Sequence, residues 1–250
     1  LPEICVSRGF CMKNGAPTQK YKTLPFTNLD NRKIYQSLAP GVLTRRADEI
    51  GLSLFPDLEI LKRKLADIVP SDESTGLRIL EIGFGEGRVL RWLLKHFETA
   101  SVTGLEVSEK LVERLPPDLI QKKGLQIIHS SVLEYEPESA FNVALLLWSA
   151  FMEFNPAEKA ALLSRLHQIL LPGGLVAIDL PYTFFADAIS GDETFQVHVY
   201  EGERICFHLI PDQELVDLAK RSGFAEVEKT VYQTRGVVKQ DRVLFLLRKA

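Results

Sequence analysis

One stretch constrains the fold of this chain more than any other: LRILEIGFGEGRVLRWLLKHF, residues 77–97. The short apolar run at 78–83 is of the buried-strand type. It opens into a turn with glycines at alternate positions, namely Gly83, Gly85 and Gly87. Apolar residues then recur at helical spacing, at Val89, Leu90, Leu93, Leu94 and Phe97. Because glycine permits positive φ and close approach to the backbone, this strand, turn and helix predict a ligand-binding unit.

The rest of the chain repeats the alternation of strands and helices. Further strands are expected at 101–107, 125–132, 141–148, 175–180, 226–232 and 242–248. Helices are expected at 54–68, from Ser108 through Leu115, after the cap at Asn155, and in PDQELVDLAKRSGF before Gly223. The runs TFQVHVY and RICFHLI predict a hairpin inserted within 183–210.

This order of elements predicts a fold class. Alternating strands and helices favour right-handed crossovers and a parallel sheet with helices on both faces. We therefore expect an α/β, Rossmann-like, doubly wound seven-stranded sheet, mostly parallel with an antiparallel C-terminal β-hairpin strand. Residues 1–70 would form an N-terminal arm and helical lid, although a disordered tail explains 1–30 equally well. Residues 71–250 would form the binding domain, with 183–210 as a candidate substrate cover.

Composition narrows the function classes. The 250 residues carry a net charge of −3, so the basic field that non-specific nucleic-acid binding requires is missing. Three cysteines, without a CxxC pair or Cys/His ligand spacing, indicate neither a disulfide framework nor a structural zinc site. No apolar run approaches the roughly 18–20 residues of a membrane helix, and the N-terminal residues lack a signal-peptide core. A reducing cytoplasm is the expected compartment, with no metal and no membrane contact.

The glycine turn itself favours one kind of ligand. Its spacing is Gly-x-Gly-x-Gly, whereas the dinucleotide fingerprint is Gly-x-Gly-x-x-Gly. Glu86 lies inside the turn and Glu81 just before it, and two acids suit a cationic or neutral adenosyl ligand better than a diphosphate. Glu106 ends the next strand, where a carboxylate can accept both ribose hydroxyls. A purely structural turn and a solvated Glu106 are the alternatives.

At this point the sequence resembles class I S-adenosylmethionine-dependent methyltransferases. The motifs LEIGFGEGR, VTGLEVS, HSSVLEYEP, FNVALLLWSAFMEF, LPGGLVAIDL and ELVDLAKRSGF follow those of the family in order, over about residues 77–248. The resemblance implies S-adenosyl-L-methionine as cofactor and S-adenosyl-L-homocysteine as product. It also implies a set of cofactor-binding residues: Glu81, Gly83, Phe84, Gly85, Gly87, Glu106, Val107, Ser131, Val132, Leu147, Trp148 and Tyr35.

Two positions depart from the family pattern. Ser131 stands where the family often has an Asp that binds the adenine amino group; a hydroxyl can accept that bond, but without charge. Asn142 stands where the family often has Asp at the start of the fourth strand, and we expect a structural role for it.

A catalytic base is not evident from the sequence. Methyl transfer from a sulfonium mainly needs alignment, exclusion of water and, for an O or N acceptor, removal of a proton. Glu153, His208 and Tyr182 are the candidates. A helix-capping or solvated role competes for Glu153, a half-buried structural role for His208, and packing for Tyr182 and Tyr35 alike.

The expected function is methyl transfer by in-line displacement to an unidentified small-molecule acceptor, by a monomer or homodimer. A protein or peptide methyltransferase and a non-catalytic S-adenosylmethionine- or S-adenosylhomocysteine-binding regulatory module are the alternatives; a dinucleotide oxidoreductase is a more distant one. DLPY at 179–182 is similar to the Asp/Asn-Pro-Pro-Tyr motif of amino-methylating nucleic-acid enzymes, but it lacks the first proline and follows the wrong strand.

Overall fold

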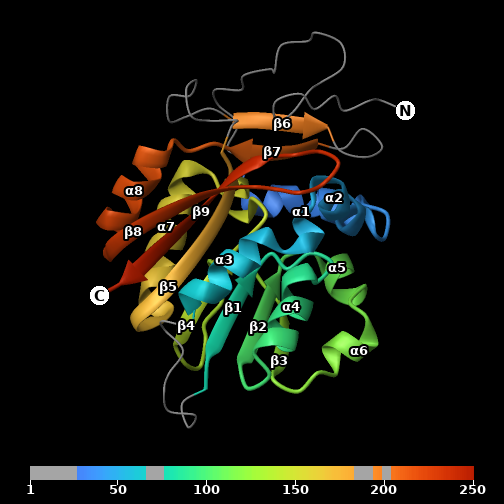
Figure 1. Cartoon of the computed structure of the whole chain (residues 1–250), viewed down its shortest axis with the longest axis horizontal. Coiled ribbons are helices and arrows are strands. Elements are labelled where there is room, and N and C mark those ends of the chain that lie inside the picture. Colours follow the sequence, from blue (N-terminus) through green and yellow to red (C-terminus); the bar gives the residue numbers. More distant parts are fainter. Residues whose placement is uncertain (1–26, 66–75, 183–193, 199–203) are drawn as a thin grey trace.

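The computed structural model describes residues 27–65, 76–182, 194–198 and 204–250 (Figure 1). Its centre is a seven-stranded sheet in the order β3-β2-β1-β4-β5-β9-β8. The strands are β1 Arg78–Ile82, β2 Ser101–Glu106, β3 Leu125–His129, β4 Phe141–Leu146, β5 Leu170–Pro181, β8 Phe224–Gln233 and β9 Asp241–Lys249. Strands β3, β2, β1, β4 and β5 are parallel, and β9 pairs with β5 and β8 antiparallel. The expected fold class is confirmed.

Helices cover both faces of this sheet (Figure 1). They are α1 Asn28–Ser37, α2 Val42–Ile50, α3 Pro56–Leu65, α4 Arg88–His96, α5 Glu109–Glu113, α6 Pro117–Ile120, α7 Pro156–Ile169 and α8 Asp212–Arg221, with 3₁₀ turns η1 Leu52–Leu54 and η2 Ala150–Glu153. One buried cluster joins the sheet to α7, α8 and η2. The other joins it to α3 and α4. Since successive strand residues point to opposite faces, β1 supplies Leu80 to the first cluster and Ile79 to the second.

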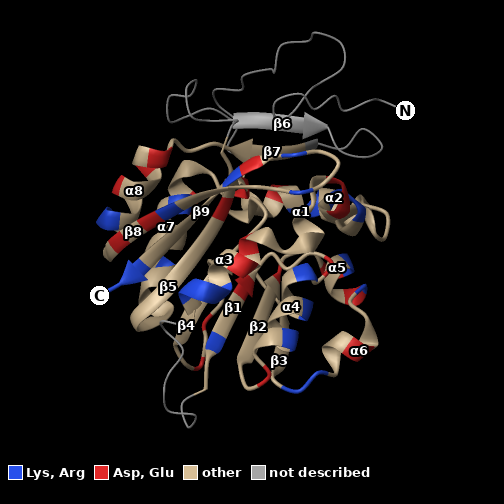
Figure 2. Cartoon of the chain, viewed as in Figure 1, with Lys and Arg blue, Asp and Glu red and all other residues tan. Residues whose placement is uncertain are grey.

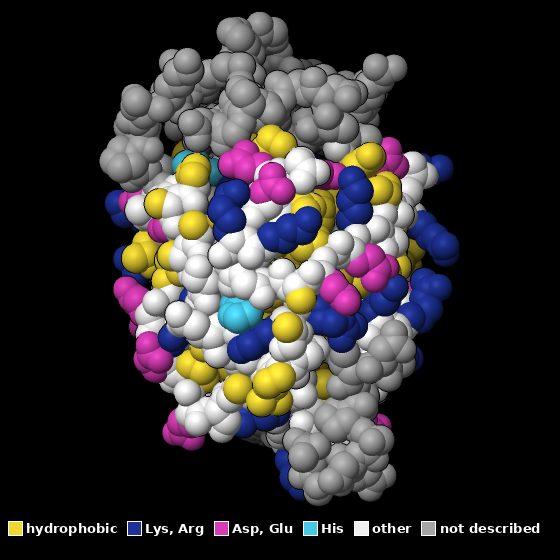
Figure 3. All heavy atoms as spheres, turned by 90° about the vertical axis from the view of Figure 1, so that its left-hand side faces the viewer, with side chains coloured by type: hydrophobic (Ala, Val, Ile, Leu, Met, Phe, Trp, Pro, Cys, Tyr) yellow, Lys and Arg dark blue, Asp and Glu magenta, His cyan; other side chains and the backbone are white. Residues whose placement is uncertain are grey.

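The antiparallel edge closes one side of the sheet without a crossover helix. Strand β9 is almost entirely buried, while β8 at the edge exposes most of its side chains. The face seen in Figure 3 intermingles positive, negative and apolar side chains. Charged groups along β8, such as Glu226, Glu228 and Lys229, discourage pairing of this edge with another strand.

A cap lies beyond the carboxyl ends of the parallel strands (Figure 1). It consists of α1, α2 and a two-stranded antiparallel sheet, β6 Thr194–His198 and β7 Arg204–His208, which is the inserted hairpin that the sequence predicts. Asn31 of α1 fastens the two parts together, because its side chain donates to the Cys206 carbonyl at 2.9 Å and accepts from the Cys206 N–H at 3.0 Å. Both residues are buried.

The cap is also fastened to the C-terminal hairpin. The Val238 N–H, in the β8–β9 loop, donates to the Glu49 carbonyl of α2 at 2.9 Å. Gly51 and Gly236 face each other so closely that a Cβ on Gly51 would lie 2.1 Å from the Gly236 nitrogen. Only glycine fits this approach, so the loop and the end of α2 form one packed unit.

Several element boundaries differ from the predictions. Strand β5 begins at Leu170, ahead of the predicted start at residue 175, and so includes the LPGG segment. The helix after Ser108 is shorter than predicted, and a second short helix, α6, begins at Pro117, where proline occupies the first helical position. Helix α3 is described only as far as Leu65, and the proposed arm at 1–26 lies outside the described residues.

Candidate active site

A cavity of about 420 Å³ opens between the sheet and the cap. We call the part formed by Glu81, residues 83–87 and Glu106 the glycine-turn side. The part formed by Tyr35, Glu153, Ile205 and Phe207 is the cap side. All of these residues except Gly87 line the cavity. The first set comes from the carboxyl ends of β1 and β2 and the second from α1, η2 and β7.

The glycine turn has the backbone that its spacing predicts. Gly83, Gly85 and Gly87 all have positive φ, at 72°, 56° and 78°, a region that other residues enter only with strain. The Gly83 N–H donates to the Leu105 carbonyl of β2 at 2.8 Å. This bond ties the turn to the neighbouring strand and leaves the turn open toward the cavity.

Glu106 is fixed by the backbone around it. Its Oε2 accepts from the Gly85 N–H at 3.0 Å, and its Oε1 accepts from the N–H groups of Val107 and Ser108 at 2.9 and 3.0 Å. Burial raises the pKa of Glu106, and the three N–H donors oppose that rise. Since a carboxylate offers about four acceptor positions, three backbone bonds still leave one position on the cavity side.

Glu81 is the least satisfied polar group in the described part of the cavity. Its side chain is 3% exposed, and its Oε2 has no hydrogen-bond partner among the described residues. Burial raises the pKa of Glu81 to about 8; nearby Arg88 opposes the rise and Glu106 adds to it. In such a place the ionised carboxylate is unfavourable unless a cation or a hydrogen-bond donor lies next to it.

Glu86 has a role that its place in the sequence does not suggest. Instead of facing a ligand, its carboxylate accepts from the Gly41 N–H at 2.6 Å and from the Thr44 N–H and hydroxyl at 2.8 and 2.7 Å. These donors belong to the N-terminus of α2, where an acid is stabilising. Glu86 thus connects helix α2 of the cap to the glycine turn by hydrogen bonds.

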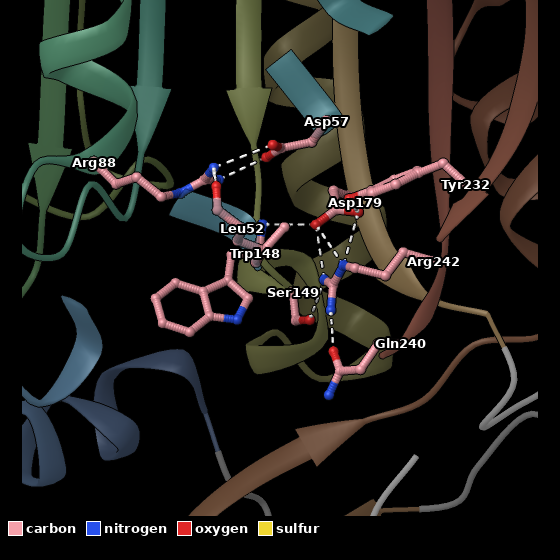
Figure 4. A network of polar contacts seen from close by, with 9 residues as sticks. All are labelled: Leu52, Asp57, Arg88, Trp148, Ser149, Asp179, Tyr232, Gln240 and Arg242. Carbon is pink, nitrogen blue, oxygen red and sulfur yellow. Dashed lines mark hydrogen bonds and ion pairs between the residues drawn. The ribbon is translucent and has the colours of Figure 1, made fainter. Parts of the chain in front are cut away.

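The wall after β4 contains a strained turn that a buried ion pair supports (Figure 4). Trp148 and Ser149 have φ of 51° and 70°, which is unfavourable for side chains other than glycine. The Asp179 carboxylate accepts from the Trp148 N–H at 3.0 Å and from Arg242 at 2.7 Å. Arg242 also donates to the Ser149 hydroxyl at 3.0 Å. Tyr232 donates to Asp179 at 2.8 Å. The network therefore anchors the turn to strands β5, β8 and β9.

A second buried pair lies beside the first (Figure 4). Arg88, at the start of α4, donates to both oxygens of Asp57 at 3.1 and 2.6 Å and to the Leu52 carbonyl at 3.0 Å. Asp57 is fully buried. The bidentate contact joins the glycine-turn helix to α3 and neutralises both charges.

On the cap side, two helical segments bring a tyrosine and a carboxylate together. The Tyr35 hydroxyl donates to Oε1 of Glu153. Burial raises the pKa of Glu153 to about 8, and hydrogen bonds from Tyr35 and Asn31 oppose that rise while Glu106 adds to it. Burial and the neighbouring Glu153 in turn hold the pKa of Tyr35 well above its usual value. Tyr35 therefore remains a hydrogen-bond donor at ordinary pH.

Most of the residues expected at the site line the cavity, and four do not. Those that do are Tyr35, Glu81, Gly83, Phe84, Gly85, Glu106, Val107, Val132, Leu147, Trp148 and Glu153. Ser131 is buried, and its hydroxyl accepts from the Leu133 N–H at 3.3 Å. Gly87 begins α4 behind the turn.

The other two of the four are proposed bases. Strand alternation on β7 sends Ile205 and Phe207 to the cavity and His208 to the opposite side. There the His208 carbonyl accepts from the buried Lys159 Nζ. Tyr182 packs against the sheet core. The structure thus brings neither His208 nor Tyr182 to the cavity and leaves Glu153 as the base candidate that it contains.

Some contributors were not evident from the sequence. Asp179, Arg242 and Gln240 support or line the site from β5, β9 and the loop between β8 and β9. Asn142 has the structural role expected of it, because its Oδ1 accepts from the Arg78 N–H at 2.8 Å and joins β4 to β1. A charged residue within an otherwise apolar strand, as in LVAIDL and DRVLFLL, is the signal that could have identified the Asp179–Arg242 pair.

Comparison with known families agrees with this arrangement. Residues 79–174 match the family described as "Methyltransferase domain", a segment that runs from β1 into β5 and includes the glycine turn. This segment is similar to methyltransferase domains, and the fold of the chain is that of solved S-adenosylmethionine-dependent methyltransferases.

Individual relatives are distant. "Uncharacterized methyltransferase YdaC" of Bacillus subtilis is 27% identical over 105 residues, which are 42% of this chain and 56% of that protein. A "tRNA1(Val) (adenine(37)-N6)-methyltransferase" of Vibrio campbellii is 25% identical over 171 residues, covering 58% of this chain and 69% of the relative. Among solved structures, 1,6-didemethyltoxoflavin-N1-methyltransferase of Burkholderia thailandensis superposes with a TM-score of 0.65 at 18% identity, over 95% of this chain and 98% of that one.

The residues of the glycine-turn side fit the cofactor of the superfamily. A buried carboxylate oxygen without a partner, on Glu81, suits an ammonium, and Glu106, which lines the cavity, keeps one acceptor position.

None of the described helices is long and apolar enough to span a membrane. The described residues also contain no cluster of His, Cys, Asp and Glu suited to a metal ion.

Proposed function

We propose that this chain transfers a methyl group from S-adenosylmethionine to a small-molecule acceptor. One observation carries the proposal: a single cavity joins a glycine turn that has two buried acids, Glu81 and Glu106, to a cap side that has its own acid, Glu153. The glycine-turn side has groups that suit the nucleoside and the amino-acid portions of the cofactor. The cap side offers apolar surface with a proton acceptor.

Within this cavity each group on the glycine-turn side has a proposed task. Glu81 would meet the methionyl ammonium, directly or through water, and Glu106 would accept from a ribose hydroxyl at its remaining acceptor position. Val107 and Val132 would pack on either side of adenine, while Leu147 and Trp148 would face the methionyl part. The three N–H donors on Glu106 support its role, since they hold that carboxylate in place before a ligand arrives. The burial of Glu81 without a partner on Oε2 supports the other, since an ammonium would satisfy it.

Bound S-adenosylmethionine supplies an electrophilic methyl group on a positively charged sulfur. The chain has to hold the acceptor in line with that carbon, keep water out and remove a proton where the acceptor requires it. The cap residues Tyr35, Ile205 and Phe207 cover the cavity and can exclude water. Glu153 lies among them and can receive a proton.

A small acceptor is favoured over a macromolecule by the cap and by the surface charge. The cap encloses the cavity between α1, α2 and β7. Acidic and basic residues are interspersed over the described elements (Figure 2), and the chain carries a net charge of −3. Electrostatic attraction of a nucleic acid would need a concentrated basic area instead.

Calorimetry followed by an acceptor screen tests the proposal. S-adenosylmethionine and S-adenosylhomocysteine should bind in a one-to-one ratio, and NAD should not. Ligand at about 100 times its Kd should stabilise the fold by about 2.7 kcal/mol. A pool of small metabolites should then give acceptor-dependent S-adenosylhomocysteine. Binding without turnover on any pool would favour a regulatory module, and binding of NAD alone would overturn the proposal.

A further inference from the structure

The arginines and the acids that line the cavity differ in whether they have partners of opposite charge. Two arginines in its wall are neutralised by buried acids, Arg88 by Asp57 and Arg242 by Asp179. The two more exposed arginines that line it are also engaged: Arg46 pairs with Glu49 at 2.7 Å, and Arg91 donates to the Glu86 carbonyl at 2.8 Å. Among the described lining residues, therefore, every arginine already has an oxygen partner.

The acids that line the cavity are not all paired in this way. Glu86 is satisfied by the N-terminus of α2. Glu81 and Glu106 have proposed roles toward the cofactor. Asp48 also lines the cavity but is exposed. Glu153 is the half-buried acid that remains, and its hydrogen-bond partners Tyr35 and Asn31 are neutral. In its ionised form Glu153 therefore gives the cap side a negative group without a positive one beside it.

The cavity that Glu153 lines has many apolar side chains in its wall. Met152, Phe154 and Ile205 are at most 6% exposed and line the same cavity. Trp148 and Phe207 add aromatic surface to its wall. A carboxylate in such surroundings is stabilised by a cation that comes into contact with it, and aromatic faces also attract cations. A neutral alcohol would leave the acid without a counter-charge, and an anion would be repelled by it.

We propose that the acceptor is an apolar amine, which binds to Glu153 as its ammonium form and is methylated on nitrogen. This inference rests on the proposed function and names its substrate class. Tyr35 is a positioning residue, because its hydroxyl holds the Glu153 carboxylate toward the cavity.

The bonds and charges balance as follows. One ammonium N–H proton moves to the Glu153 carboxylate, and the electron pair of that bond stays on nitrogen as a lone pair. The lone pair forms the new bond from nitrogen to the methyl carbon. The carbon–sulfur bond breaks at the same time, and its electrons neutralise the sulfonium. The products are a methylated ammonium and S-adenosylhomocysteine, and the proton on Glu153 returns to solvent.

Matched ligands test the inference independently of turnover. Protein saturated with S-adenosylhomocysteine is titrated calorimetrically at pH 7.5 with apolar amines, each paired with its alcohol and its carboxylate analogue, such as tryptamine, tryptophol and indole-3-acetate. Amines that bind should do so at least tenfold more tightly than their alcohols. Glu153→Gln should remove that preference while leaving alcohol affinity within twofold. Glu109→Gln, an exposed acid on α5 outside the cavity lining, makes the same charge change and should preserve the preference.

The outcomes separate this inference from the proposed function. If wild-type protein binds S-adenosylhomocysteine but alcohols bind as tightly as amines, or no amine in the panel binds, the amine assignment is wrong and methyl transfer still stands. The same holds if Glu153→Gln leaves the amine preference intact. If S-adenosylhomocysteine itself does not bind, the proposed function fails first. Retention of S-adenosylhomocysteine affinity by Glu153→Gln shows that this variant is folded.

Discussion

The two sides of the cavity are built in different ways. The glycine-turn side comes from two neighbouring strands and the turn between β1 and α4, within 26 residues of sequence from Glu81 to Glu106. Backbone N–H groups hold the Glu106 carboxylate there. The cap side brings Tyr35 against Glu153, 118 residues further along the chain, and then against β7. Side-chain contacts hold that assembly together.

This difference indicates which side binds a ligand common to many related proteins and which side binds a ligand that varies among them. A site made of backbone donors keeps its geometry under many sequences, which suits a ligand common to a whole superfamily. A site made of distant side chains can change one residue at a time, which suits an acceptor that differs between members. The two sides should therefore respond differently to mutation.

The largest effect is expected where the sheet supports the strained turn. Arg242→Leu leaves Asp179 buried, charged and without its ion-pair partner, which should cost about 3–5 kcal/mol of unfolding free energy. Urea unfolding measures it. Arg248→Leu on the same strand breaks a 3.8 Å pair with the exposed Glu226 and a 3.4 Å hydrogen bond to the Gly173 carbonyl, and should cost less than about 1 kcal/mol. Equal losses in the two variants would show that the buried network does not support the turn.

Glu81→Gln should make the ligand-free protein more stable at alkaline pH. Burial raises the pKa of Glu81 from 4.5 to about 8, so the stability linked to this group is present below about pH 4.5 and is lost as pH rises through about 8. At pH 9 the substitution should gain about 1–3 kcal/mol. Near pH 4.5 the gain should disappear. Thermal unfolding at both pH values checks this, and S-adenosylmethionine affinity should fall in the same variant. A gain that does not depend on pH would contradict a raised pKa of Glu81 as its cause.

Glu86→Ala should loosen the cap without touching Glu106. The variant removes the acceptor for three donors at the N-terminus of α2, which corresponds to about 1–2 kcal/mol for a helix cap. Amide hydrogen exchange should accelerate in α2 and stay unchanged in β1 and β2. Uniform acceleration throughout the sheet would mean that Glu86 stabilises the whole fold instead of clasping the cap.

The smallest effect is expected for Tyr35→Phe, which removes one hydroxyl on the cap side. A hydrogen bond of this kind contributes about 0.5–1.5 kcal/mol. The Tyr35 hydrogen bond lowers the pKa of Glu153, while burial and Glu106 raise it. Its loss should therefore raise that pKa further. Because the carboxylate form accepts the proton, the acid limb of the rate profile should move to higher pH, with substrate KM changing less than kcat. An unmoved limb would exclude Tyr35 as a positioning residue.

The sequence predicts the glycine-turn side because its information is local. Strand, glycine spacing and the acid at the end of the next strand all lie within one βαβ unit, so Glu81 and Glu106 could be placed before any coordinates. The antiparallel C-terminal edge of the sheet also follows, since the last two strands have no helix between them. The order of the strands was not predicted and comes from the structure. The fold class is confirmed, and the match of residues 79–174 to a methyltransferase domain agrees with the resemblance.

The cap side is harder to predict because its contacts are long-range. No local pattern indicates that Asn31 binds Cys206, or that the face of β7 carrying Phe207 and not His208 turns to the cavity. Glu86 misled for the same reason: it belongs to the glycine turn by sequence, but its partner is α2, more than 40 residues away. Tertiary packing decides such contacts, and sequence periodicity does not contain that information.

One measurement tests the division of the cavity most directly: calorimetric binding of S-adenosylhomocysteine to Glu106→Ala and Glu153→Gln. Loss of the charge-assisted ribose contacts in Glu106→Ala should weaken binding by about 1–3 kcal/mol. Glu153→Gln, on the cap side, should change it by less than about 0.5 kcal/mol. Wild-type affinity in Glu106→Ala, or an equal loss in both variants, would contradict the division of the cavity into two separate sides.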